Sequence, residues 1–280
     1  DTAAQYGITV PVYDRETAEL ISAAAERTGK PVTVHYKLDT GMTRLGFPSW
    51  ECEQTVQDIL ACSKLPGLIS EGIFTHFAVA DVPSGEAYTE LQYKRFSDVC
   101  EGLQAAGLDL PLRHCANSGA IQTYEKMHCT MTRAGIILYG YRPDASVPPV
   151  LDLRPAMTVK ARVCRCAIFR RIRPSAMAAP SRRQSDPYGG YLDGIRGRLS
   201  AYRLGQGAGA ARRRESARAR PYLQDMCMVR IPEGVDVHRG DEVTVFGPEG
   251  WTAEDAADAA GTISYEVLCA ISRRVPRFYR

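Results

Sequence analysis

The sequence predicts an α/β protein with a parallel sheet, followed by a smaller domain built from β-strands. Over the first 147 residues, β-type runs and amphipathic helical patterns alternate about every 35 residues, the rhythm of βα units with parallel strands. From Leu151 the helical patterns stop, and short strand-like segments separated by turn residues follow. We therefore expect two domains, residues 1–147 and residues 148–280.

The individual elements follow from two periodicities. Alternating apolar residues predict strands, and apolar residues three or four apart predict helices. In the first domain we expect strands over residues 7–13, 32–37, 68–77, 112–118 and 131–140, and helices over residues 15–28, 53–62 and 88–106. In the second domain we expect strands over residues 153–163, 225–231, 241–247 and 262–269.

Composition and cysteine spacing exclude several protein classes. The chain is 45% apolar, as in ordinary globular proteins. No apolar run reaches the roughly 18 residues of a membrane helix, and no signal peptide opens the chain, so a cytoplasmic protein is expected. The nine cysteines show no C-x-x-C spacing, which predicts reduced thiols and no metal site or disulfide framework.

The net charge of +3 conceals a strongly basic stretch. Residues 162–220 hold fifteen arginines, no lysine and three acidic residues, which leaves the rest of the chain acidic. Such a stretch could bind nucleic acid or another anionic surface, or form a disordered linker. A third interpretation, which we favour, is an altered copy of an ordinary β segment, such as an out-of-frame reading would give.

Residues 32–47 present an arginine just after a strand. The strand ends in Asp39-Thr40-Gly41, where the glycine allows a tight exit, and Arg44 follows within one turn of chain. An arginine at the carboxyl end of a strand is a common anion-binding device in α/β enzymes. A buried strand with a solvated arginine beyond it would explain the same pattern.

The eleven residues from Lys37 read Lys-Leu-Asp-Thr-Gly-Met-Thr-Arg-Leu-Gly-Phe, which resembles the signature of the alanine racemase family. The resemblance implies a (β/α)8 barrel that binds pyridoxal phosphate, followed by an all-β C-terminal domain. A complete barrel takes about 250 residues and only about 145 precede the second domain here. We therefore expect the C-terminal part of a barrel, with five strands instead of eight.

The resemblance assigns roles around the cofactor ring and the substrate. Arg44 would contact the cofactor's phenolic oxygen and the substrate carboxylate. Lys37 stands where the family often has a carbamate that orients this arginine, although a lysine paired with a local acid fits equally well. His76 in Thr-His-Phe-Ala would lie against the pyridine ring; a lone histidine is more often structural.

Further positions would hold the phosphate and the pyridine nitrogen. Ser118 would bind phosphate through its hydroxyl, with the backbone amides of Gly135 and Ile136. Arg133 would face the pyridine nitrogen, supported by His114. Arginine keeps its proton, so the nitrogen would stay unprotonated and simple proton exchange at Cα would be favoured over transamination.

The resemblance places the last roles in the second domain. Racemisation requires an acid–base group on each face of the substrate. Tyr191 in Gly-Tyr-Leu-Asp-Gly-Ile would be one such group, reaching the site of the partner subunit in a head-to-tail homodimer. Tyr265 would add a phosphate contact. Gln224 stands beside the expected substrate carboxylate in place of the family's usual methionine.

One expected motif is not found. The family holds its cofactor on a lysine in a Lys-Ala-Asn-Ala-Tyr-Gly-like motif, and none of the six lysines lies in a similar sequence. We therefore expect this polypeptide by itself to lack useful racemase activity.

The main functional expectation is an alanine racemase that interconverts L- and D-alanine and supplies D-alanine for cell-wall peptidoglycan. Alternatives are a racemase for serine or another amino acid, suggested by Gln224, and a non-catalytic pyridoxal-phosphate-binding protein, suggested by the missing lysine. A pyridoxal-dependent decarboxylase would require an acid where Arg133 stands, and a nucleic-acid-binding module is the least favoured alternative. No membrane or nucleic-acid partner is expected.

Overall fold

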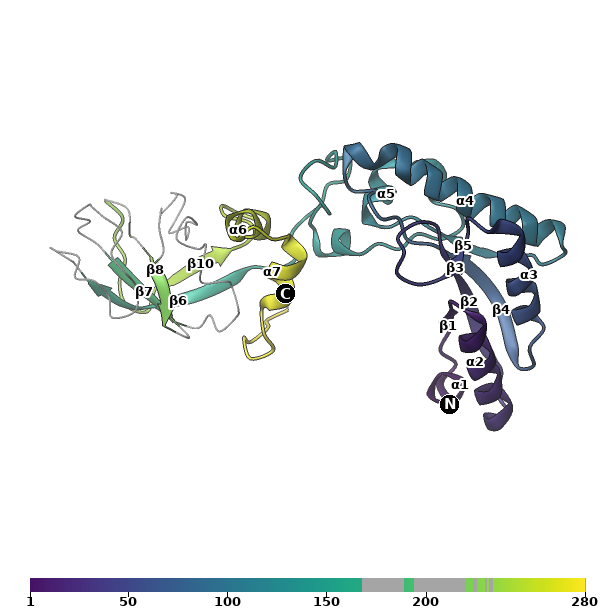
Figure 1. The fold of residues 1–280 in the computed structure, drawn as a ribbon. Coiled ribbons are helices and arrows are strands. Elements are labelled where there is room, and N and C mark those ends of the chain that lie inside the picture. Colours follow the sequence, from purple (N-terminus) through teal and green to yellow (C-terminus); the bar gives the residue numbers. More distant parts are fainter. Residues whose placement is uncertain (168–188, 194–219, 224–225, 230, 232–233, 280) are drawn as a thin grey trace. The chain divides into compact units, whose positions relative to one another are not determined.

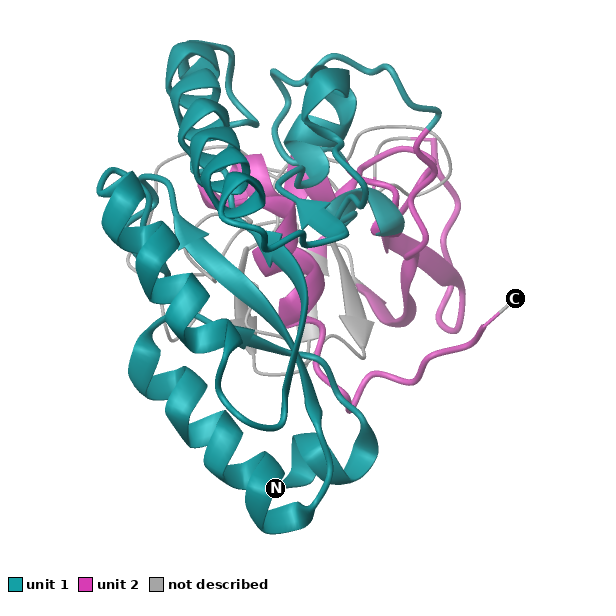
Figure 2. Cartoon of the chain, turned by 90° about the vertical axis from the view of Figure 1, so that its right-hand side faces the viewer, with its two compact units in different colours: residues 1–138, 142–152 teal, residues 139–141, 153–280 magenta. Residues whose placement is uncertain are grey.

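The computed structural model describes residues 1–167, 189–193, 220–223, 226–229, 231 and 234–279. The chain forms two compact units (Figure 2). One comprises residues 1–138 and 142–152, and the other residues 139–141 and 153–280. Most of the basic stretch lies outside the described residues.

The first unit is built on a parallel sheet, as the alternation of strands and helices predicted. Its strands are β1 (Val10–Val12), β2 (Val32–Asp39), β4 (Leu68–Phe74) and β5 (Leu112–His114), hydrogen-bonded in that order. The short strand β3 (Phe47–Pro48) pairs with the end of β2. All these pairings are parallel, so the carboxyl ends of the strands lie at one edge of the sheet.

Helices cover one face of this sheet. Helix α1 (Thr2–Tyr6) precedes β1, and α2 (Arg15–Thr28), α3 (Cys52–Ser63) and α4 (Glu86–Ala105) connect the strands. Figures 1 and 2 show α2, α3 and α4 along the same side of the sheet. Local sequence sets the ends of α2: the Asp14 carboxylate accepts a hydrogen bond from Thr17 N, and Gly29 closes the helix in the left-handed conformation.

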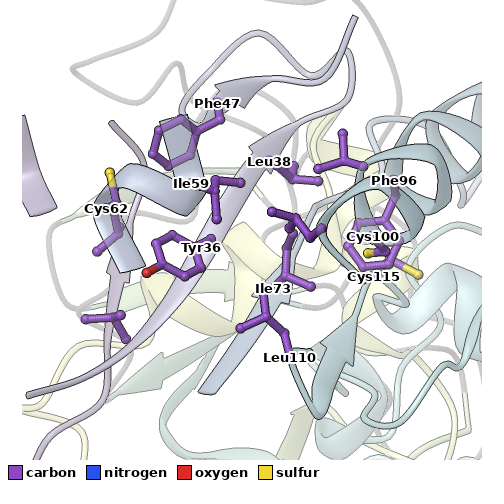
Figure 3. Close-up of a cluster of buried hydrophobic side chains, with 14 of the residues drawn as sticks. Tyr36, Leu38, Phe47, Ile59, Cys62, Ile73, Phe96, Cys100, Leu110 and Cys115 are labelled. Carbon is purple, nitrogen blue, oxygen red and sulfur yellow. The ribbon is translucent and has the colours of Figure 1, made fainter. Parts of the chain in front are cut away.

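Strand β2 divides its side chains between two environments. Val32, Val34, Tyr36 and Leu38 are at most 2% exposed and belong to the core. Figure 3 shows Tyr36 and Leu38 among core side chains from α3 and α4. Because side chains alternate along a strand, residues 33, 35, 37 and 39 face the other side of the sheet.

A β-bulge in β4 interrupts the regular pairing with β2. Val34 pairs with Ser70 but His35 pairs with Gly72, so Glu71 is the additional residue. A bulge of this kind re-aims side chains, and here it brings Glu71 to the His35 ring. Gly72 is required beside it, because a Cβ there would lie 2.9 Å from the ring and 2.7 Å from Leu112 O.

Two expectations for the end of the first unit were wrong. Residues 131–140 form no strand; Ile136–Tyr139 is a 3-10 helix, η3. Its apolar run suggested a strand, but Leu138 and Tyr139 are 72% and 58% exposed. Likewise the strand expected over residues 112–118 ends at His114, and Ser118 begins helix α5 (Ser118–Thr123), capped by the Asn117 side chain. The remaining 3-10 turns are η1 (Pro83–Gly85) and η2 (Glu125–Met127).

The second unit contains a β-sheet, as expected, and its strands pair antiparallel. Its strands lie in the order β10 (Glu242–Phe246), β6 (Val159–Ala167), β7 (Gly189–Asp193), β9 (Met226–Val229) and β8 (Arg220–Leu223). Two helices follow, α6 (Ala253–Ala260) and α7 (Ser264–Ala270). The strand expected over residues 262–269 was therefore wrong. Ser264, Val267 and Leu268 are the buried positions of α7, a helical spacing that the short β-branched run concealed.

Within the described part of the chain, no helix combines the length and apolar character that crossing a membrane requires.

Candidate active site

The residues singled out in the first unit gather where the parallel strands end. Lys37 lies near the end of β2, His76 follows β4 by two residues, and His114 is the last residue of β5. The carboxyl ends of parallel strands are the usual location of active sites in α/β proteins. The site is therefore built by strand register and not by proximity in sequence.

Arg133 occupies the centre of this group. Its Nη1 donates to His114 O (2.9 Å), and its Nη2 donates to Thr75 O (2.7 Å) and approaches His76 Nδ1 at 3.5 Å. Within the described ranges, no carboxylate forms a salt bridge with it. Burial lowers the pKa of this guanidinium, but arginine still keeps its proton at neutral pH. The site therefore holds a positive charge that is fixed by neutral partners.

A directional chain of hydrogen bonds starts at this arginine. Arg133 Nη1 donates to His114 Nδ1 at 2.8 Å. A neutral imidazole has one donor and one acceptor nitrogen, so His114 Nε2 carries the proton and donates to His35 Nδ1 at 2.8 Å. By the same reasoning His35 Nε2 donates to the Glu71 carboxylate at 3.0 Å. The chain thus fixes both tautomers and ends on the bulge of β4.

Stacking reinforces this chain. The ring of Phe74 stacks on His114 with centroids 4.8 Å apart and an interplanar angle of 6°. The guanidinium carbon of Arg133 lies 5.5 Å from the Phe74 centroid, within range of a cation–π interaction. Burial and the charge of Arg133 lower the pKa of His114 to about 3, so this ring stays neutral at physiological pH.

His76 is also neutral. Burial lowers its pKa to about 4, and the positive charges of Arg133, Arg44 and Lys37 act in the same direction. A neutral ring that is only partly buried can lie against a flat ligand without adding charge to the site. The charge of Arg44, whose side chain is exposed, lowers the pKa of both His76 and Lys37.

Lys37 is 8% exposed, and its Nζ donates to Leu38 O (2.6 Å) and Leu45 O (3.3 Å). Burial lowers its pKa to about 8, and Asp39 opposes this effect. A large fraction of its amine is therefore neutral in weakly alkaline solution. Among the described residues, no carboxylate forms a salt bridge with Lys37, and the acceptors of its Nζ are backbone carbonyl oxygens.

The loop that presents Arg44 is anchored by Asp39. The Asp39 carboxylate accepts hydrogen bonds from Gly41 N (2.9 Å) and Thr43 N (3.0 Å), as in an Asx turn. Gly46 has a φ of 126°, and a Cβ there would lie 2.5 Å from Asp39 N. The conformation of the loop thus depends on Asp39 and Gly46, which both belong to the sequence pattern of residues 37–47.

Ser118 and Gly135 form a second group, at the start of α5. Gly135 N donates to Ser118 Oγ at 2.9 Å, and Ser118 is 5% exposed. The hydroxyl proton of Ser118 and the Ile136 amide are donors of the kind that bind phosphate, whereas the Gly135 amide is directed at Ser118 Oγ in this structure. Arg133 is two residues before Gly135, and its own N donates to Ala116 O (3.0 Å), which joins the two groups.

Comparisons with known proteins found matches to one family in both units. A family model described as alanine racemase, N-terminal domain, matches residues 1–143, and one described as alanine racemase, C-terminal domain, matches residues 188–279. The alanine racemase of Desulfovibrio desulfuricans is 37% identical over 288 residues, covering 97% of this chain and 72% of that protein. The chain belongs to the alanine racemase family. The alanine racemase of Clostridium tetani is 35% identical and covers 100% of this chain and 73% of its own length.

Solved structures of alanine racemases share this fold, in which an α/β unit with a parallel sheet, as in part of a (β/α)8 barrel, is followed by a unit with an antiparallel sheet. An alanine racemase of Clostridium difficile 630 matches with a TM-score of 0.87 and 36% identity, covering 100% of this chain and 72% of that one. The alanine racemase of Streptomyces lavendulae, an organism described as producing D-cycloserine, matches with a TM-score of 0.86 and 29% identity. This match covers 99% of this chain and 74% of that one. A histidine racemase of Leuconostoc mesenteroides matches with a TM-score of 0.82 at 24% identity, which shows the fold alone.

The structure places the remaining candidate residues of this alanine racemase family member in the second unit. Tyr191 lies in β7, paired with Arg165 of β6 and Met228 of β9. Tyr265 lies in the first turn of α7 and is 37% exposed. Gln224 lies outside the described residues. Lys37, Arg44, His76, His114 and Arg133 come together in the first unit, as do Ser118, Gly135 and Ile136.

Sequence reasoning missed three polar residues that hold this site. His35 and Glu71 extend the chain from Arg133, and the buried Gln92 of α4 donates to Thr40 Oγ1 (3.0 Å) and accepts from Ala78 N (2.9 Å). Gln92 thereby ties the ends of β2 and β4 to the helix. A glutamine that is 0% exposed in an amphipathic helix has no sequence signal, whereas the Glu-Gly pair within a strand pattern could have suggested the bulge.

Proposed function

We propose that this protein is a pyridoxal-phosphate-dependent alanine racemase, which interconverts L- and D-alanine in the cytoplasm and supplies D-alanine for peptidoglycan. The observation that supports the reaction most directly is Arg133, a partly buried, hydrogen-bonded cation without a described acid partner. Its neutral surroundings suit an arginine that donates to a neutral acceptor.

The residues present fit pyridoxal phosphate. Arg133 would donate to the pyridine nitrogen, and the neutral ring of His76 would lie beside the pyridine face. Ser118, with the amides of Gly135 and Ile136, would hold the phosphate, and Tyr265 would add a contact to it. When bound, the cofactor withdraws electrons from the substrate Cα and so makes its proton acidic.

The basic partner at the pyridine nitrogen favours racemisation over other reactions. Because Arg133 keeps its proton, it does not protonate the ring nitrogen, and electron withdrawal stays limited. The chain through His114 and His35 to Glu71 holds the guanidinium in one orientation. Proton exchange at Cα needs only this limited withdrawal, whereas transamination needs a deeper electron sink.

Substrate binding and proton transfer are assigned to groups on two domains. Arg44 and Gln224 would bind the alanine carboxylate. Lys37 would support Arg44, either as a neutral amine or as a carbamate, since burial keeps much of its amine unprotonated near pH 8. Tyr191 would move a proton at Cα on one face of the substrate.

A head-to-tail homodimer would complete the site. In this arrangement the barrel part, residues 1–147, of one subunit would meet the β domain, residues 148–280, of its partner. Tyr191 and Tyr265 would then serve the partner's cofactor. What supports this assembly is the division of the site residues between two units, with Arg133 in the first and Tyr191 and Tyr265 in the second.

The decisive experiment follows the Cα proton. Because none of the lysines in these 280 residues lies in the family's cofactor motif, the protein assayed must also carry that motif. Loaded with pyridoxal phosphate, it should convert either enantiomer of alanine into the racemate in D2O and incorporate deuterium at Cα, whereas the 280 residues alone should not. Arg133→Gln should lower kcat/KM by about 100-fold, the size of effect seen when a preorganised donor is removed. Arg27→Gln, whose exposed side chain pairs with Asp1, is the matched control and should leave the rate unchanged.

The alternatives make different predictions in the same assay. Faster exchange with serine or another amino acid than with alanine would favour a racemase of different specificity, and the histidine racemase of the same fold makes a substrate panel worthwhile. Tight cofactor binding with no exchange for any amino acid would favour a non-catalytic pyridoxal-phosphate-binding protein. Either result would replace the proposal.

A further inference from the structure

Two cysteine thiols lie next to each other beside the candidate active site. Cys115 directly follows β5, and Cys129 lies in the turn after η2, and their sulfur atoms are 3.6 Å apart. Two hydrogen bonds connect the two segments: Arg113 N donates to the Thr130 side-chain Oγ1 (2.7 Å), and Thr130 N donates to Arg113 O (3.1 Å). These hydrogen bonds hold the two segments, and therefore the two cysteines, next to each other.

The two thiols differ in accessibility and acidity. Cys115 is 0% exposed, whereas Cys129 is exposed. The hydrogen bond between the two thiols and the charge of Arg113 lower the pKa of the Cys129 thiol, although desolvation opposes them. The same hydrogen bond and burial raise the pKa of Cys115. Cys129 is thus the thiol that solvent-borne reagents meet first, and it is the one more readily converted to thiolate.

We propose that Cys129 and Cys115 form an oxidant-sensitive modification site, in which a hydroperoxide converts the two thiols into an intramolecular disulfide. The Cys129 thiolate attacks one peroxide oxygen; an S–O bond forms, the O–O bond breaks, and the leaving hydroxide takes up a proton as water. Cys115 then attacks the sulfenic sulfur. An S–S bond forms, the S–O bond breaks, and hydroxide leaves with the Cys115 proton as a second water.

The geometry permits this step with little rearrangement. A disulfide requires the sulfurs to approach from 3.6 Å to about 2.05 Å. The exposed Cys129 side chain can supply this movement, whereas Cys115 is fixed by the core and by its contact with Met127 O (3.0 Å). The sequence contained no signal for the pair, since fourteen positions separate the two cysteines.

The disulfide would lie beside the residue proposed to face the pyridine nitrogen. Arg133 Nη2 lies 3.4 Å from Cys115 O, and Arg133 N donates to Ala116 O. Cross-linking would fasten the segment that leads to Arg133 onto the end of β5. The chemistry of the thiol pair itself does not depend on the proposed function.

Peptide mapping tests the proposal directly, because trypsin cleaves between the two cysteines at Lys126. The full-length protein is treated with hydrogen peroxide, blocked with N-ethylmaleimide and digested without reductant. We expect peptide 114–126 linked to peptide 127–133, lighter than their sum by two hydrogen atoms, and loss of this species after dithiothreitol. The proposal would be overturned if peptides 114–126 and 127–133 were recovered unlinked, each with one maleimide label. It would also be overturned if Cys129 were joined to a second protein molecule.

Variants establish the order of the two steps. Cys115→Ser should stop at a sulfenic acid on Cys129 that dimedone labels, and Cys129→Ser should leave Cys115 unoxidised. Cys269→Ser, at an exposed position of α7, is the control and should form the linked pair like the wild type. Dimedone labelling of Cys115 in the Cys129→Ser protein would contradict the proposed roles. Because the wild-type peptide map needs no substitution, a variant that fails to fold does not prevent the test.

Discussion

His76 and His114 are neutral in the folded protein for the same physical reason. Each is removed from water and lies near Arg133, so a second positive charge would be costly there. Their pKa values of about 4 and about 3 lie well below the ordinary value of 6.5. This cost links the protonation of the site to the stability of the fold.

The resulting pH dependence has a definite sign. Below about pH 6.5 the unfolded chain binds protons at both histidines that the folded chain does not bind. The free energy of unfolding should therefore fall as the pH falls from about 6.5 to about 4, by at most about 1.4 kcal/mol per pH unit for each group. The value for His76 is reduced by solvent screening, because its ring is only partly buried.

A histidine substitution isolates this effect. In His76→Asn, the free energy of unfolding from urea titrations should decline less steeply between pH 6.5 and pH 4.5 than in the wild type. His238→Asn, whose side chain is 73% exposed, serves as the control and should keep the wild-type slope. Equal slopes for all three proteins would show that His76 takes up its proton in the folded state.

At the scale of elements, the bulge in β4 connects strand register to the site. It directs Glu71 onto His35, and Gly72 leaves the room that the His35 ring occupies. A Cβ at position 72 would meet a backbone oxygen as well as the ring, so movement of one side chain could not relieve the overlap. The glycine is therefore a requirement of packing at this position.

Gly72→Ala should lower the free energy of unfolding by about 1 to 3 kcal/mol, the usual cost of overpacking a core. Urea denaturation monitored by circular dichroism would measure it. Ile69→Ala is the matched control in the same strand, since Ile69 is 49% exposed and contributes little to the core. A loss in Gly72→Ala no larger than in the control would mean that the bulge accommodates a methyl group.

The elements also show how far sequence reasoning reached. Strand β2 and helices α2, α3 and α4 were predicted because their apolar periodicity is long and regular. The strands predicted over residues 131–140 and 262–269 were wrong, because short segments rich in apolar residues do not distinguish a strand from a helical turn. The extension from His114 to His35 and Glu71 could not be predicted, since it depends on strand register and on a one-residue bulge.

At the scale of the whole molecule, the proposed roles are divided between the two units. Arg133, His76 and Ser118 belong to the first unit, whereas Tyr191 and Tyr265 belong to the second. If each active site combines the barrel of one subunit with the β domain of its partner, a subunit damaged in one unit can still contribute the other. This division makes the proposed head-to-tail homodimer testable without a structure of the dimer.

Mixing two inactive proteins should restore activity. Arg133→Gln damages only the barrel contribution, and Tyr191→Phe removes only the hydroxyl contributed by the β domain. When equal amounts are dissociated and reassociated, half of the dimers should be mixed, and each mixed dimer should hold one intact site of two. Racemisation of L-alanine should therefore recover to about a quarter of the wild-type rate, as random pairing in a twofold dimer requires. If the mixture stays as inactive as its components while light scattering shows exchanged dimers, each site is built within one subunit, and Tyr191 acts on its own barrel.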